Sequence, residues 1–160
     1  MQTASIRKMV LAAMLAALCC VATLVIQVPI PGGGYVNLGD AIVLLCGWLL
    51  GPAYGCAAAG LGSALADLLT GYSVYAPGTL VIKSHMALLA CLPLWRKRRW
   101  MGALMAEGWM VAGYFLYGLL LGQGAAASAA GIPGNLIQGA MGMVFALIAH
   151  TFLKRTPLVK

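Results

Sequence analysis

Residues 8–27, KMVLAAMLAALCCVATLVIQ, decide the fold class, because this apolar run is long enough to cross a bilayer as one helix. Arg7 precedes the run, and the Pro- and Gly-rich residues 28–34 (VPIPGGG) end it. The run is longer than the core of a signal peptide, and no A-x-A cleavage motif closes it. We therefore expect a retained first membrane span.

Working outward, five more apolar segments follow the first one. The chain has 160 residues, of which 62% are hydrophobic and only 8% charged, whereas soluble domains carry roughly a quarter charged residues. This composition excludes a soluble domain and also excludes disorder. We predict an all-α integral membrane protein with a single domain, residues 1–160. Its six predicted spans are residues 8–27, 38–52, 53–71, 78–95, 101–122 and 132–153.

The second and third spans are short and meet at Gly51 and Pro52. Proline removes a backbone donor and glycine tolerates a turn, so we expect a division there. One unbroken helix over residues 38–71 would far exceed the thickness of a bilayer.

Positive charge predicts the orientation of the spans. The sequence contains ten Lys and Arg residues and three Asp and Glu residues, which gives a formal net charge of +7. With the N-terminus inside, the predicted outer loops 28–37, 72–77 and 123–131 contain no Lys or Arg, so both termini are expected in the cytoplasm. This distribution argues against nucleic-acid binding and for contact with anionic lipid. The basic residues at span ends are Arg7, Lys8, residues 96–99, Lys154, Arg155 and Lys160.

Polar side chains inside the predicted spans are few, and most lie at one depth. Such groups are costly in hydrocarbon and tend to face a cavity or a partner. At about 1.5 Å rise per residue, they fall in the outer third of the spans, which predicts a cavity for a small polar molecule open to the outside. The residues in this layer are Asn37, Asp40, Asp67, Lys83, Tyr117, Asn135 and Gln138.

Structural roles would explain part of this set equally well. Asn37, Asp40 and Asn135 stand at predicted helix starts and also fit N-caps. Asp67 and Lys83 also fit a purely structural ion pair. Both interpretations stay open at this point.

Glu107 lies deeper, in the inner half of the fifth predicted span. It fits the floor of the cavity, a partner for an inner basic group, or a contact with another protein. Tyr114 and Tyr117 share a helix face above it, although Tyr117 also fits an interfacial anchor. His85 lies about 200° around the helix from Lys83, so only one of the two can face a small cavity, and we favour Lys83.

Several kinds of chemistry are missing from the sequence. It has no G-x-x-x-x-G-K-[ST] phosphate loop, no H-E-x-x-H motif and no G-x-S-x-G motif. Its five cysteines lie inside apolar runs without metal-ligand spacing. We therefore expect neither an enzyme nor a metal site, and no ATP hydrolysis by this chain.

Small residues recur every four positions in the first span, as Ala12 with Ala16 and as Ala13 with Ala17. Such small faces allow close helix contact in lipid. We expect one of the two pairs to meet another protein, and the spacing does not choose between them.

The sequence resembles the substrate-binding S components of energy-coupling factor (ECF) vitamin transporters. The resemblance extends over nearly the whole chain and is closest to the members assigned to pyridoxine or hydroxymethylpyrimidine. It is carried by residues 36–40 (VNLGD), 50–55 (LGPAYG), 62–69 (GSALADLL), 75–83 (YAPGTLVIK), 113–116 (GYFL) and 132–139 (IPGNLIQG).

The resemblance implies a six-helix, multi-pass subunit of a prokaryotic plasma membrane that captures a vitamin or vitamin precursor from outside. It implies a transmembrane coupling subunit and two ATPase subunits as partners, which use the ATP, so no cofactor is expected in this chain. In the family, the small face of the first span contacts the coupling subunit, and the subunit is thought to topple in the membrane to release its substrate.

Two alternatives remain beside this hypothesis. A small membrane enzyme acting on lipid would use Glu107 and His150 as its polar groups. A structural subunit without a ligand would need no site at all.

Overall fold

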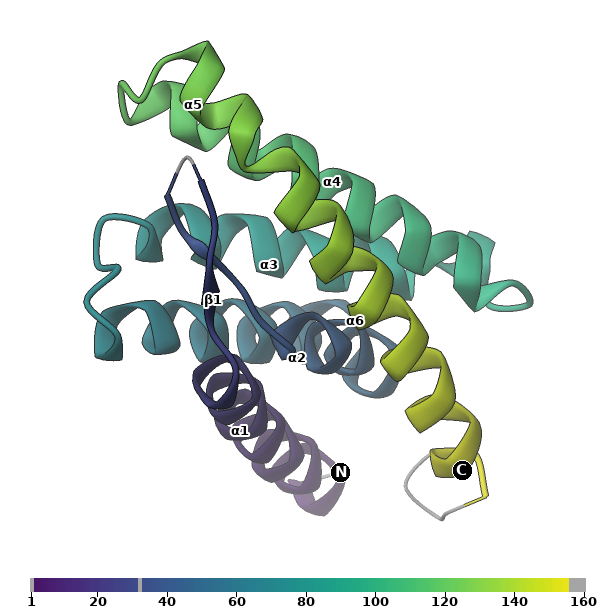
Figure 1. The fold of residues 1–160 in the computed structure, drawn as a ribbon. Helices are drawn as coiled ribbons and strands as arrows, with labels where there is room; N and C mark the ends of the chain where they lie inside the picture. The colour runs from purple at the N-terminus through teal and green to yellow at the C-terminus, as the bar shows by residue number, and fades with distance from the viewer. Residues whose placement is uncertain (1, 32, 156–160) are drawn as a thin grey trace.

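The computed structural model describes residues 2–31 and 33–155, with side chains from residue 5 onward, and is mostly helical. Lys160, part of the predicted charge pattern, and the ends of the predicted domain 1–160 lie outside these residues. Figure 1 shows long helices packed side by side, with a short strand pair across one end. The elements are α1 (Gln2–Val25), β1 (Val28–Pro29), β2 (Tyr35–Val36), α2 (Gly39–Leu69), α3 (Ala76–Cys91), η1 (Pro93–Trp95), α4 (Arg99–Leu120), α5 (Ala125–Ala130) and α6 (Ile132–Leu153).

α2 is broken at Gly51, the only residue within it with non-helical backbone angles (φ 75°, ψ −170°), and Pro52 follows. A Cβ at Gly55 would lie 2.6 Å from the carbonyl oxygen of Cys46. Nine residues along a straight helix span about 13 Å, so the two halves of α2 must fold back on each other. The predicted segments 38–52 and 53–71 correspond to these two halves.

Four helical stretches are long and apolar enough to cross a membrane by length and composition: Ser5–Val25, Gly39–Leu69, Arg99–Leu120 and Ala125–Leu153. Ala76–Cys91 is a shorter apolar helix. The prediction of six crossings is therefore not confirmed by length, and it stays a prediction together with the orientation of the termini.

Three predicted boundaries were wrong. The span predicted for residues 78–95 ends as a helix at Cys91, because Pro93 disfavours helical geometry at the residue before it and starts the separate 3₁₀ turn η1. The loop predicted for residues 123–131 contains the short helix α5. The loop predicted for residues 28–37 contains β1 and β2, which pair antiparallel with Val28 opposite Val36.

Small residues let the helices approach closely. α1 packs on α2 where the Ala16 carbonyl meets Gly62, and α2 packs on α3 where Gly47 meets the Ala87 backbone. A side chain at either glycine would overlap these backbone atoms, so the glycines set the helix spacing. In Figure 1, the start of α1 and the end of α6 lie on the lower right side, whereas α5 and the tip of the strand pair lie at the upper left.

Candidate functional site

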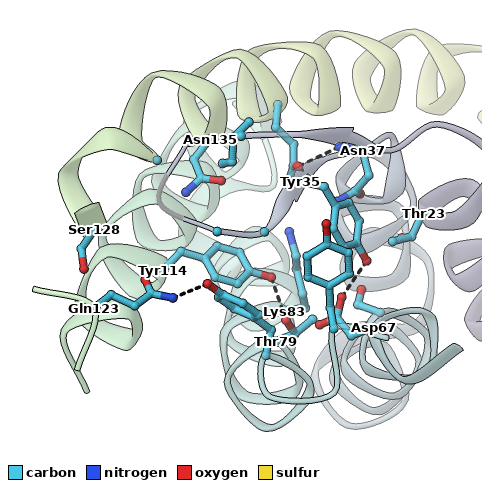
Figure 2. A pocket seen from close by; sticks show the side chains of 18 residues that line it. Thr23, Tyr35, Asn37, Asp67, Thr79, Lys83, Tyr114, Gln123, Ser128 and Asn135 are labelled. Carbon is cyan, nitrogen blue, oxygen red and sulfur yellow. Dashed lines mark hydrogen bonds between the residues drawn. The ribbon is translucent and has the colours of Figure 1, made fainter. Parts of the chain in front are cut away.

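A cavity of about 50 Å³ lies between the strand pair and helices α2, α3, α4 and α6 (Figure 2). Its lining is polar and aromatic, and it gathers six of the nine residues predicted as a site. The six are Asn37, Asp67, Lys83, Tyr114, Asn135 and Gln138. Asp40, Glu107 and Tyr117 do not line it but lie behind residues that do.

Lys83 reaches the cavity from the middle of α3, with its side chain 3% exposed. Its ammonium group forms an ion pair with Asp40, which is completely buried in the first half of α2. The nitrogen also lies 5.4 Å from the centre of the Tyr114 ring, within cation–π range. The alternative of an ion pair between Lys83 and Asp67 is not what the described residues show, because folding of α2 brings Asp40 to the lysine instead.

Gln138 on α6 is fixed by hydrogen bonds at both ends of its amide. Its Nε2 donates to Asp40 Oδ2 at 2.8 Å, and its Oε1 accepts from the Asn37 backbone N–H at 2.9 Å and from Asn37 Nδ2 at 3.1 Å. Asn37 Oδ1 in turn accepts from the Gly39 backbone N–H at 2.8 Å. Asn37 therefore accepts a hydrogen bond from the first residue of α2 and also lines the cavity, but the N-cap of that helix is Leu38 and not Asn37.

Glu107 lies in the contact between α4 and α6, not in the cavity. Its carboxylate packs where Gly139 and Gly142 leave room, and Gly142 also faces Asp40. Neither carboxylate oxygen has a hydrogen-bond partner among the described residues. One of the three roles considered for Glu107 was pairing with a basic group. Within the described residues, Glu107 forms no such pair.

Asp67, near the end of α2, holds the strand pair in place. Its Oδ1 accepts a hydrogen bond of 2.6 Å from the hydroxyl of Tyr35 on β2. Burial and this bond to a carboxylate raise the pKa of the Tyr35 hydroxyl. The Tyr35 ring also packs against Tyr72, with ring centres 4.8 Å apart. The second oxygen, Asp67 Oδ2, has no partner among the described residues.

A row of tyrosines forms another wall. The Tyr75 ring lies 6.3 Å from both Tyr72 and Tyr117, measured between ring centres. Tyr117 is fixed by donating to the Val74 carbonyl at 2.9 Å, so it supports Tyr75 from behind. Figure 2 shows Gln123 reaching across to this row, where its amide donates to the Tyr75 hydroxyl.

The tip of the strand pair covers the cavity. Gly33, with φ of 90°, lies against the hydroxyl of Tyr75 and the amide of Gln123. Ile30 packs on Gly134 at the start of α6. The cover is therefore held by contacts with three separate parts of the chain.

Sequence reasoning missed most of the lining that comes from outside the long spans. Thr79, for example, gave no signal beyond its place on the same predicted span as Lys83. The missed residues include Thr23, Tyr35, Tyr72, Tyr75, Thr79, Gln123 and Ser128.

The two alanine pairs of α1 face different surroundings. Ala12 and Ala16 are half-buried and pack toward the core, whereas Ala13 and Ala17 are exposed. His85 is likewise exposed, and its ring lies 5.5 Å from Trp109, away from the cavity.

The described residues contain no group of three His, Cys, Asp or Glu side chains able to hold a metal ion. The five cysteines are all free thiols. The arrangement offers a small cavity, with an anchored cation and amide at one wall and aromatic rings at another.

Comparison with known proteins gives a consistent result. The chain matches the family model described as ECF-type riboflavin transporter, S component, over residues 3–155. The thiamine precursor transporter HmpT of Lactococcus lactis subsp. cremoris (strain MG1363) is 31% identical over 162 residues, which cover 99% of this chain and 95% of that protein.

An uncharacterized protein in the gap 3' region of Pyrococcus woesei is 48% identical over 64 residues, which cover 39% of this chain and 43% of that protein. A solved structure described as "Structure and mechanism of the S component of a bacterial ECF transporter" has a TM-score of 0.72 and 25% identity, covering 94% of this chain and 99% of that one. The family and the structural neighbour are transporter components, not enzymes.

Proposed function

This chain belongs to the family of ECF-type riboflavin transporter S components, and from that premise we propose that its cavity captures a small hydroxylated nitrogen heterocycle from outside the cell. The substrate class is hydroxymethylpyrimidine- or pyridoxine-like. The relative HmpT is a thiamine precursor transporter, which supports this class.

The observation that carries the proposal is the position of Lys83 and Gln138. Both are nearly completely buried, and both line the cavity opposite aromatic rings. Burying such groups is costly unless they are satisfied, and here Asp40 holds both of them in place. Fixed donors beside stacking rings suit a flat ligand that bears ring nitrogens and hydroxyl groups.

The volume of the cavity supports a small ligand. A cavity of about 50 Å³ holds a few water molecules, so even a single ring requires the cover to move. We propose that the strand pair and the residues after α4 lift as a lid, since Gly33 and Gln123 meet each other at the Tyr75 hydroxyl. A three-ring flavin would require a far larger opening.

In this proposal, partner subunits supply the energy for uptake. ECF S components work with a coupling subunit and ATPases, and we propose one transmembrane coupling subunit and two ATPase subunits for this chain. The exposed Ala13 and Ala17 are the pair available to the coupling subunit, because Ala12 and Ala16 already pack inward. ATP is then used by the partners, and this chain needs no cofactor.

We propose six crossings of a prokaryotic plasma membrane, with α2 contributing two as a folded-back pair and both termini in the cytoplasm. The basic residues support this topology, because residues 96–99 follow α3 at the end of the molecule away from the cavity cover (Figure 1). No observation favours the lipid-enzyme alternative, since Glu107 and His150 are buried and neither lines the cavity.

Uptake of labelled hydroxymethylpyrimidine and pyridoxine tests the function. Membrane vesicles containing this chain, the coupling subunit and both ATPases are compared with vesicles whose ATPases carry an inactivating substitution. We expect uptake only with active ATPases. Uptake that is unaffected by inactive ATPases would contradict the proposal.

A further inference from the structure

A second cavity, of about 280 Å³, lies at the other end of the helices from the substrate cavity. It opens between the break in α2, the end of α3, η1 and the start of α4. Its lining combines small and apolar residues with two aromatic and two cationic side chains. The aromatic and cationic side chains are those of Trp48, Trp95, Arg96 and Arg99.

The two arginines of this cavity have no carboxylate partner among the described residues. The sequence contains three acidic side chains: Asp40 and Glu107 lie in the helix core, and Asp67 lines the substrate cavity. Within the described residues, neither Arg96 nor Arg99 forms an ion pair. Two guanidinium groups that share one cavity without a carboxylate favour an external anion.

The aromatic residues add a fixed frame and a donor. Trp48 donates to the Ala90 carbonyl at 3.1 Å, and the Arg99 guanidinium lies 5.5 Å from the centre of its ring. Trp95 packs against Gly102, which leaves room for its ring. The indole N–H of Trp95 is buried and has no acceptor among the described residues, although an unmet buried donor is costly.

We propose that this cavity binds the phosphate group of an anionic phospholipid. A phosphate oxyanion accepts hydrogen bonds from both guanidinium groups and from the free indole N–H. Two large apolar neighbours point to a lipid: Leu94 is 75% exposed and Trp100 is 51% exposed, beside the cavity-lining Trp95 and Arg99. Tryptophan and arginine at span ends are typical of the membrane interface, where a headgroup and its chains meet both surfaces.

Native mass spectrometry of the detergent-purified protein tests the proposal. The protein is equilibrated with equal amounts of phosphatidylglycerol and phosphatidylcholine, with and without excess inorganic phosphate. The Arg96→Gln/Arg99→Gln variant is compared with Lys97→Gln/Arg98→Gln, which removes the same charge from the same connection outside the cavity. The thermal unfolding midpoint of each variant shows whether the fold is retained.

We expect wild type to retain phosphatidylglycerol over phosphatidylcholine, and Arg96→Gln/Arg99→Gln to weaken that retention about tenfold or more. Lys97→Gln/Arg98→Gln should change it less than about twofold, because Lys97 and Arg98 do not line the cavity. Trp95→Phe removes the N–H and leaves a smaller aromatic ring, so retention should fall about threefold to tenfold even if the double variant fails to fold, and its own unfolding midpoint shows whether the packing on Gly102 survives.

Three results would overturn the proposal. Equal losses in the two charge variants would indicate diffuse attraction rather than a site. Displacement of phosphatidylglycerol by inorganic phosphate would assign the cavity to free phosphate. Absence of any lipid preference, together with loss of coupling-subunit binding in Arg96→Gln/Arg99→Gln, would assign it to an acidic protein segment.

Discussion

Lys83 of α3 and Asp40 of α2 form a buried ion pair that is 43 residues apart in sequence, and Gln138 of α6 binds the second carboxylate oxygen at 2.8 Å. These three residues join three helices beside the cavity, and two of them, Lys83 and Gln138, line it. The ion pair between Lys83 and Asp40 therefore also connects two helices. Its effects on protein stability and on ligand binding need separate tests.

The ion pair should make Asp40 essential for stability. Asp40→Asn leaves the Lys83 ammonium buried without a counter-charge, and breaking a buried pair costs about 3–5 kcal/mol. We expect thermal unfolding in detergent to show this loss. Asp40→Leu/Lys83→Met, which removes both charges, should recover most of it. An Asp40→Asn protein as stable as wild type would contradict the structural role of the ion pair.

Gln138 should be required for binding and should also contribute to stability. Gln138→Ala removes the group that fixes Asn37, so we expect substrate affinity to fall about tenfold, or 1.4 kcal/mol, and the unfolding temperature to fall because Asn37 and Asp40 each lose a buried hydrogen-bond partner. Titration calorimetry with hydroxymethylpyrimidine measures this. His85→Ala is the matched control, since His85 is exposed away from the cavity, and it should bind normally.

The cover over the cavity can be tested with two neighbouring glycines. Gly33 and Gly34 have φ of 90° and 82°, so alanine strains the backbone at both positions. Only at Gly33 does the added methyl meet the Tyr75 hydroxyl, whereas nothing lies within 4 Å at Gly34.

We therefore expect faster substrate dissociation in Gly33→Ala than in Gly34→Ala, measured by stopped-flow release. Equal rates in the two variants would show that contact with Tyr75 does not hold the cover closed.

The exposed alanine face of α1, formed by Ala13 and Ala17, should affect assembly with the coupling subunit but not substrate binding. Ala13→Trp should prevent co-purification with the coupling subunit and leave substrate binding unchanged. Ala16→Trp should instead destabilise the fold, because Ala16 meets Gly62 of α2. Leu116→Trp, at an exposed site on α4, is the control and should assemble normally. Normal assembly of Ala13→Trp would contradict the proposed interface.

Sequence alone predicted six of the residues that line the cavity, because polar groups inside apolar helices are conspicuous. Lys83 and Gln138 were predicted in this way, since each lies within a largely hydrophobic segment. The partner of Lys83 was missed, because helical spacing describes one helix and does not say how the halves of α2 fold back at Gly51. That fold brings Asp40 next to α3.

The tyrosines were missed for a different reason. Tyr35, Tyr72 and Tyr75 lie in connecting segments, where no periodicity indicates which way a side chain faces. Their positions depend on long-range contacts such as the bond from Tyr35 to Asp67. The strand pair itself has only two residues in each strand, too short for an alternating pattern to be recognised.

The central claim is that this cavity holds a small hydroxylated nitrogen heterocycle bound through Lys83 and Gln138. Mass-spectrometric identification of the small molecule that co-purifies with the wild-type protein tests it most directly, with Gln138→Ala and His85→Ala purified in parallel. The account predicts a single-ring pyrimidine or pyridine alcohol in wild type and His85→Ala, and its loss in Gln138→Ala. A flavin, or a ligand retained equally by all three proteins, would contradict it.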